Sequence, residues 1–202
     1  MPTKMSSNNI YPFEVETNVN ASVPIKLFPI VIWLMGLSSS GKSTIAKELK
    51  SFLEAQGIVT ALLDGDNLRF GLSNNLGFSD EDRIENIRRA TEVAKLFVNA
   101  GVCTICCFIT PNKQAQETVA QIIPEGKLFA IYLSTSIEEC EKRDVKGLYA
   151  KARAGEIKWF TGIDSAFDIP DFINLTLDNT NQTVLESVDL ILKNIPLEEK
   201  KQ

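Results

Sequence analysis

Residues 36–44, with the sequence Gly-Leu-Ser-Ser-Ser-Gly-Lys-Ser-Thr, have the types and spacing that bind the phosphates of a nucleotide. Glycines let the backbone fold tightly enough for consecutive N–H groups to point at phosphate oxygens. Lys42 would reach the β- and γ-phosphates of ATP, and the Ser43 hydroxyl would ligate Mg²⁺. The predicted ATP-binding loop comprises Gly36, Leu37, Ser38, Ser39, Ser40, Gly41, Lys42, Ser43 and Thr44.

The alternative reading of this motif is a Gly/Ser-rich turn before a surface helix. The flanking sequence favours nucleotide binding, because an apolar run at 30–35 precedes the loop and Ile45, Leu49 and Leu53 follow it at helical spacing. A strand that runs into the loop and a helix that leaves it are the context that a phosphate-binding loop requires.

Two carboxylates, Asp64 and Asp66, follow the predicted strand 58–63. An Asp-Gly-Asp sequence is often only a turn. Beside a phosphate-binding loop, however, one carboxylate can hold Mg²⁺ and another can accept the proton of an attacking hydroxyl. The sequence has no histidine, so any proton acceptor must be Asp, Glu or Lys.

The net charge of −5 argues against a general nucleic-acid binder or membrane-surface binder, because such partners select a basic surface. We expect neither partner. The apolar run 27–37 is too short to cross a bilayer, which needs about 20 residues. Cys103 and Cys106 lie three apart on a predicted strand, so they should face opposite sides and bind no common metal. With Cys107 and Cys140 they are expected to be reduced core thiols of a cytosolic protein.

Alternating patterns predict an α/β fold: a mostly parallel central sheet with helices on both faces. We expect a polar, loosely ordered lead-in at 1–24, one domain at 25–196 and a charged tail at 197–202. The helix starting after Ser79 is the clearest, since Ser79 is a good N-cap and acidic residues follow it. The predicted strands are 30–35, 58–63, 102–109, 128–134 and 173–177, and the predicted helices are 42–56, 80–99, 113–122, 136–143 and 182–194.

Several further motifs follow the phosphate loop. They are Asp64-Gly65-Asp66-Asn67-Leu68-Arg69, Asn75-Leu76-Gly77-Phe78-Ser79, Asp82-Arg83 with Glu85-Asn86-Ile87-Arg88-Arg89, Phe108-Ile109-Thr110-Pro111, Arg143-Asp144-Val145-Lys146-Gly147-Leu148-Tyr149 and Ile157-Lys158-Trp159-Phe160-Thr161-Gly162-Ile163-Asp164. From about Ile32 to Asp164 the chain strongly resembles the adenylylsulfate kinase (APS kinase) family. The resemblance implies a three-layer P-loop kinase fold, a cytoplasmic homodimer, and Mg²⁺-dependent transfer of the ATP γ-phosphate to the 3′-hydroxyl of adenosine 5′-phosphosulfate (APS), giving PAPS and ADP.

The resemblance also implies roles for individual residues. Arginines matching Arg69 and Arg83, with Asn86, hold the acceptor nucleotide, and aromatics matching Phe78 and Phe160 sandwich its adenine. Guanidinium groups suit the several oxygens of a phosphosulfate, and aromatic planes suit a purine. The full implied acceptor set is Asp66, Asn67, Leu68, Arg69, Phe78, Arg83, Asn86, Ile109, Thr110, Lys146, Trp159 and Phe160, and Arg143 joins the ATP-binding residues.

We assign catalysis to Lys42, Asp64 and Asp66: Asp66 receives or orients the acceptor hydroxyl, and Asp64 with Ser43 forms the metal shell. The two carboxylates could exchange these roles. The basic segment 142–158 would be a mobile flap that closes over the phosphates. Two rival functions are a kinase of the same fold acting on a nucleoside or sugar acid, and a non-catalytic nucleotide sensor.

The chain departs from the family pattern at Ser39, where glycine is usual, at Phe70, often polar or histidine, at Thr110, usually serine, and at Trp159, commonly glycine. A serine at position 39 is tolerable if its φ is negative. Thr110 is expected to line the acceptor site without forming a covalent intermediate, because no histidine is present to activate its hydroxyl.

Overall fold

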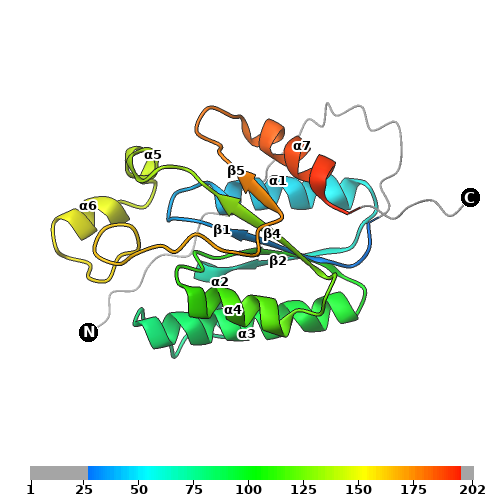
Figure 1. Ribbon diagram of the computed structural model, residues 1–202, viewed down its shortest axis with the longest axis horizontal. Helices are drawn as coiled ribbons and strands as arrows, with labels where there is room; N and C mark the ends of the chain where they lie inside the picture. Colours follow the sequence, from blue (N-terminus) through cyan, green and yellow to red (C-terminus); the bar gives the residue numbers. More distant parts are fainter. Residues whose placement is uncertain (1–26, 197–202) are drawn as a thin grey trace, which may run out of the picture.

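A computed structural model describes residues 27–196 of the chain (Figure 1). The predicted lead-in 1–24 and tail 197–202 lie outside these residues. Within the described part, no helix combines the length and apolar character needed to cross a membrane.

A five-stranded parallel sheet forms the centre of the described residues. Its spatial order is β2-β3-β1-β4-β5, and every neighbouring pair is parallel. The strands are β1 (Val31–Met35), β2 (Thr60–Asp64), β3 (Cys103–Cys107), β4 (Leu128–Leu133) and β5 (Leu175–Leu177). β1 and β3 are buried at every residue, which explains the unbroken apolar sequence of β1: a strand covered on both faces needs no polar alternation. The predicted sheet is confirmed.

Helices cover both faces of the sheet, as Figure 1 shows: α1 and α7 lie on one side, and α3 and α4 lie on the other. The helices are α1 (Lys42–Ala55), α2 (Gly65–Phe70), α3 (Asp80–Asn99), α4 (Lys113–Ile122), α5 (Ile137–Arg143), α6 (Leu148–Arg153) and α7 (Val184–Asn194). The three-layer α/β prediction is therefore confirmed. α5 and α6 lie beyond one end of the sheet (Figure 1).

The alternation of β3 divides its cysteines between two apolar cores. Cys103 and Cys107 pack in the core under α1 and α7, whereas Cys106 packs in the core under α3 and α4. All four cysteines are buried and unpaired. Burial raises the pKa of Cys107 to about 12, so its thiol stays protonated. The prediction that Cys103 and Cys106 face opposite sides of the sheet is confirmed.

Two helices were not predicted, and each begins at a loop important for the site. The Asp-Gly-Asp sequence opens α2 instead of forming a plain turn: the Asp64 side chain accepts a hydrogen bond from the Asp66 N–H at 3.0 Å. α6 starts after Gly147, whose φ is 65°. Its residues Tyr149 and Ala152 pack with Cys140 and Phe160 in a small third core.

Candidate active site

The phosphate-binding loop joins β1 to α1, and its two glycines have no room for a side chain. Gly36 has φ 146°, and a Cβ there would come within 2.7 Å of the Leu133 carbonyl oxygen. Gly41 has φ 98°, and its Cβ would come within 2.7 Å of Asn179 Nδ2. Both glycines are therefore required by conformation and by space.

Lys42 is buried at the start of α1, and its ammonium folds back over the loop. Nζ donates to the Gly36 carbonyl at 3.0 Å, to the Leu37 carbonyl at 2.5 Å and to Ser40 Oγ at 3.3 Å. Burial lowers the pKa of Lys42 to about 8. A phosphate oxygen entering the loop would supply the negative charge that this buried cation lacks.

Ser39 has φ 58°, so the condition of a negative φ, under which a serine would be tolerated without strain, is not met. The left-handed conformation favours glycine at this position, because glycine alone adopts it without a Cβ penalty. Trp159 has φ 59°, so the second departure from glycine also falls on a left-handed residue. The chain thus holds residues bulkier than glycine in strained conformations in the phosphate-binding loop, at Ser39, and just after the predicted flap, at Trp159.

Ser43 and Asp64 bring two oxygen donors together. Ser43 Oγ donates to Asp64 Oδ2 at 2.5 Å, and the other carboxylate oxygen caps α2. Hard oxygen donors suit Mg²⁺, which keeps several waters and also binds substrate phosphates, so one hydroxyl and one carboxylate fit this ion. In the described part of the chain, no group of three or more His, Cys, Asp or Glu side chains forms an alternative metal cage.

Asp66, on α2, forms an ion pair with Lys146, which lies between α5 and α6. Both side chains are largely exposed, and such pairs contribute little to folding stability. The Asp66–Lys146 contact is therefore important for where the two side chains lie, not for folding stability. It brings a residue of the predicted flap onto the carboxylate predicted to receive the acceptor proton.

Arg69 and Arg83 both contact Phe78, Arg69 at its exposed ring and Arg83 at its main-chain carbonyl. The guanidinium of Arg69 lies 4.4 Å from the centroid of the Phe78 ring. Arg83 donates to the Phe78 carbonyl at 2.9 Å, to the Trp159 carbonyl at 2.7 Å and to Thr161 Oγ1 at 3.0 Å. Arg83 thereby ties the loop before α3 to the segment after α6. Burial lowers the pKa of both arginines, and the charge of Arg83 adds to this effect at Arg69.

Phe78 and Trp159 are 64% and 65% exposed, so both rings are open to a ligand. Phe160 is only 8% exposed and packs edge-on against Tyr149, with ring centroids 4.9 Å apart. Asn86 is 5% exposed, and its Oδ1 has no hydrogen-bond partner in the described part of the chain. A buried acceptor without a donor is costly, which marks Asn86 as a candidate ligand contact.

Thr110 is fully buried with φ 51°, and its hydroxyl accepts a hydrogen bond from Trp33 Nε1 at 3.0 Å. The neighbouring Ile109 carbonyl accepts from the Gly36 N–H at 3.3 Å. This part of the predicted acceptor set therefore also holds the phosphate loop in place. Asn67 and Leu68 lie on α2, and Leu68 packs partly into the core.

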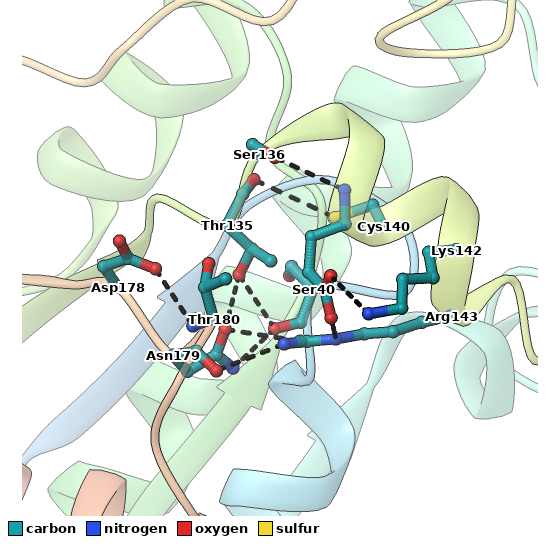
Figure 2. Close-up of polar contacts among 10 residues, drawn as sticks. Ser40, Thr135, Ser136, Cys140, Lys142, Arg143, Asp178, Asn179 and Thr180 are labelled. Atoms are coloured by element: carbon teal, nitrogen blue, oxygen red, sulfur yellow. Dashed lines mark hydrogen bonds and ion pairs between the residues drawn. The ribbon is translucent and has the colours of Figure 1, made fainter.

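Arg143 lies at the C-terminal end of α5, beside the phosphate loop (Figure 2). Its Nε donates to Glu139 Oε1 at 3.0 Å, and its Nη2 donates to the Asn179 carbonyl at 3.1 Å. Sequence reasoning missed Asn179 and its partner Thr135. The only signal was their position just after the predicted strands 173–177 and 128–134, at the edge where the carboxyl ends of parallel strands meet.

The fold is shared with known kinases. A family described as Adenylylsulphate kinase matches residues 28–178. The adenylyl-sulfate kinase of Bacteroides thetaiotaomicron is 48% identical over 96% of this chain and 98% of its own length. The APS kinase of Mycobacterium tuberculosis, solved in complex with AMPPNP and APS, is 38% identical with a TM-score of 0.77, over 85% of this chain and 98% of its own.

A gluconokinase from Sinorhizobium meliloti shares the fold alone, at 19% identity and a TM-score of 0.56, over 84% of this chain and 93% of its own. The match to the Adenylylsulphate kinase family and the similarity to the Bacteroides thetaiotaomicron enzyme show more than a shared fold. Both extend through the predicted acceptor-side motifs as well as the phosphate loop. The chain belongs to the adenylylsulphate kinase family.

Proposed function

We propose that Lys42, Asp64 and Asp66 carry out the reaction of this family at the edge of the sheet where the phosphate loop, α2 and the α5–α6 loop meet. The enzyme transfers the γ-phosphate of ATP to the 3′-hydroxyl of APS, giving PAPS and ADP. The observation that carries the residue assignment is the pair of contacts made at the start of α2. Asp64 contacts the phosphate loop through Ser43, and Asp66 contacts the flap through Lys146.

The donor nucleotide would bind in the loop of residues 36–44, with its phosphates on the backbone N–H groups and on Lys42. Phosphoryl transfer through a loose transition state depends on positioning and on neutralising charge more than on covalent chemistry. Lys42 supplies a fixed cation at the β- and γ-phosphates. Its buried site offers little competition from water, which strengthens the interaction.

Ser43 and Asp64 would hold Mg²⁺ in this proposal. The ion would neutralise charge on the β- and γ-phosphates when bound. Asp66 would accept or orient the proton of the acceptor 3′-hydroxyl. Lys146, now paired with Asp66, would hold that carboxylate toward the reaction centre and add positive charge near the transferred group.

The acceptor nucleotide would bind against Arg69, Arg83 and Asn86, with its purine on the aromatic side chains. The guanidinium groups of Arg69 and Arg83 now bond to loop carbonyls, which charged phosphosulfate oxygens can replace. The exposed rings of Phe78 and Trp159 are the accessible aromatic walls, and the buried Phe160 would offer an edge. Asn67, Leu68, Ile109 and Thr110 would complete the acceptor side, and Arg143 the ATP side.

Family resemblance further suggests a cytoplasmic homodimer, and four buried, unpaired thiols fit a reducing compartment. An APS kinase from Thiobacillus denitrificans, 26% identical to this chain, is a hexamer, so the dimer needs a direct test. Light scattering of the purified protein should give the mass of two chains. The mass of one chain or of six would overturn the dimer.

The acceptor is tested by measuring ADP release with APS, AMP, gluconate or shikimate. We expect turnover with APS alone, because the paired arginines and exposed rings match a nucleotide with several anionic oxygens. Faster turnover with gluconate or shikimate would replace this function by that of a sugar-acid kinase. ATP binding without turnover on any acceptor would favour a nucleotide sensor.

A further inference from the structure

Asn179 and Thr135, which belong to a buried polar cluster beside the phosphate loop, have no role in the assignments above. Asn179, two residues beyond the end of β5, is 7% exposed and lies at the centre of this cluster (Figure 2). Its Nδ2 donates to the Ser40 carbonyl at 2.8 Å. Its Oδ1 accepts from Thr135 Oγ1 at 2.6 Å and from Arg143 Nη1 at 3.3 Å. One amide thus connects the phosphate loop, the end of β4, α5 and the end of β5.

Thr135 Oγ1 also lies 3.3 Å from the Ser40 carbonyl oxygen, but its single proton goes to Asn179 Oδ1 at 2.6 Å, so Asn179 Nδ2 is the donor that fixes this carbonyl. A carbonyl fixed in this way fixes the whole Ser40–Gly41 peptide, since the peptide is planar. In a trans peptide the N–H points opposite to the carbonyl, so the Gly41 N–H is directed away from Asn179. Within residues 27–196, no backbone carbonyl accepts a hydrogen bond from this N–H, which leaves it available to a phosphate oxygen.

Space as well as hydrogen bonding couples Asn179 to the loop. A Cβ at Gly41 would come within 2.7 Å of Asn179 Nδ2 and within 3.9 Å of Arg143 Nη1. The amide therefore packs directly against the left-handed glycine. The backbone carbonyl of Asn179 also accepts from Arg143 Nη2, so both oxygens of this residue orient the same guanidinium.

We propose that Asn179 is a positioning residue for the donor nucleotide: it orients the Ser40–Gly41 peptide toward the phosphates and holds Arg143 in place at the same time. The proposal rests on the ATP-binding role assigned above to residues 36–44 and Arg143. Asn179 itself need not touch the nucleotide. Loss of its side chain should weaken ATP binding and slow turnover, while the APS site, built from α2, α3 and the segment after α6, stays intact.

The test compares Asn179→Ala and Asn179→Asp by calorimetry with ATP and by steady-state kinetics. Asp keeps the acceptor for Thr135 and Arg143 but loses the donor to Ser40 and places a carboxylate oxygen against that carbonyl. Because a lost buried hydrogen bond and an unpaired buried carbonyl each cost binding, we expect the Kd for ATP to rise about tenfold or more in both variants. The KM for APS should stay within about twofold of the parent value.

Thr135→Val and Thr135→Ser provide a second, independent pair. Val has a similar shape but no hydroxyl, so it should reproduce part of the loss in ATP affinity, and Ser should restore it. The matched control is Asn174→Ala, which removes an asparagine at the start of the same segment whose Oδ1 accepts from the Ala130 N–H at 2.7 Å. It should lower thermal stability without changing the Kd for ATP.

The outcomes separate this proposal from the proposed function. If the parent chain fails to phosphorylate APS, the function is wrong, but the Kd for ATP still tests Asn179. The proposal is overturned if Asn179→Asp and Thr135→Val bind ATP within twofold of the parent, or if Asn174→Ala loses as much affinity as they do. If Asn179→Ala does not fold, the Asp variant and the Thr135 pair decide.

Discussion

At the scale of single residues, burial decides what Lys42 can do. The three protein acceptors of its ammonium are all neutral, and burial lowers its pKa to about 8. A cation in such a site gains more from an incoming phosphate than a surface lysine would, because little water competes.

Lys42→Ala should abolish PAPS formation, because the β- and γ-phosphates lose their main fixed cation. We expect a loss of about 10²-fold or more in kcat/KM, measured by ADP release with APS as acceptor. Lys47→Ala, on an exposed position of α1, is the control and should leave turnover unchanged. Residual activity within about tenfold of the parent would limit the contribution of Lys42 to about 1.4 kcal/mol and contradict its role.

ATP affinity should fall as the pH rises through about 8. In the free protein Lys42 loses its proton near that pH, whereas bound phosphates would raise its pKa and require the proton. ATP binding above pH 8 should therefore take up a proton. Calorimetry in buffers of different ionisation enthalpy measures this proton uptake directly. If no proton is taken up at pH 8.5, Lys42 is already protonated in the free protein at that pH, which contradicts the prediction.

The roles of the two carboxylates at the start of α2, Asp64 and Asp66, should be distinguishable by how each variant responds to Mg²⁺. Asp66→Asn should keep ATP and APS binding while kcat falls about 10²-fold or more, because an amide cannot take the hydroxyl proton. Asp64→Asn should instead raise the Mg²⁺ concentration needed for half-maximal turnover. If added Mg²⁺ rescues Asp66→Asn and not Asp64→Asn, the two roles are exchanged.

At the scale of elements, α3 carries a guanidinium, that of Arg83, which joins other segments of the chain. Arg83 joins the Phe78 carbonyl to the segment of Trp159 and Thr161, which lies more than 70 residues later in the sequence. The helix is well placed to do this because Ser79 caps it, with its side chain accepting from the Asp82 N–H at 3.2 Å. The start of the helix is thereby fixed one turn from the guanidinium.

Arg83→Ala should raise the KM for APS about tenfold or more while the Kd for ATP stays within about twofold, since a charge-assisted contact of about 1.5–3 kcal/mol is lost on one side only. Arg88→Ala is the control on the same helix, because Arg88 is paired at the surface with Glu85. Equal losses for both ligands would assign Arg83 to the scaffold or to the donor site.

The phosphate loop carries strain that a single substitution can measure. Ser39 has φ 58°, so Ser39→Gly should leave the free energy of unfolding unchanged or raise it by up to about 1 kcal/mol. The same change in a helix, Ser51→Gly in α1, should lower it by about 0.5–1 kcal/mol. Urea denaturation of both variants gives the comparison, and destabilisation of similar size at both positions would argue against strain at Ser39.

At the scale of the whole molecule, the site and the core share residues. Thr110 ends the segment after β3, and its hydroxyl accepts from the indole of Trp33 in β1. Thr110→Ala should cost about 1–3 kcal/mol of stability, because it leaves a buried indole N–H unpaired, and Thr110→Ser should recover most of it. Neither the parent nor the variants should retain label from γ-labelled ATP. Label on Thr110 that transfers to PAPS would establish a covalent intermediate.

The sequence alone determined the parts of this protein that depend on local interactions. The apolar runs, the helical periods and the N-cap at Ser79 predicted five strands and the five longest helices, because period and capping act over a few residues. The phosphate-binding loop was equally clear, since its glycines, Lys42 and Ser43 act within one turn. Burial on both faces could be inferred from unbroken apolar strands.

Only the tertiary structure decided how distant side chains meet. The Asp66–Lys146 ion pair, the two contacts of Arg83 with Trp159 and Thr161, and the position of Asn179 against Gly41 join residues 76 or more positions apart, and such contacts depend on strand order and loop path. The burial of Phe160 and the positive φ of Ser39 follow from packing in the same way. Local sequence specifies the elements, whereas the parallel sheet brings their ends together and thereby sets the distances within the site.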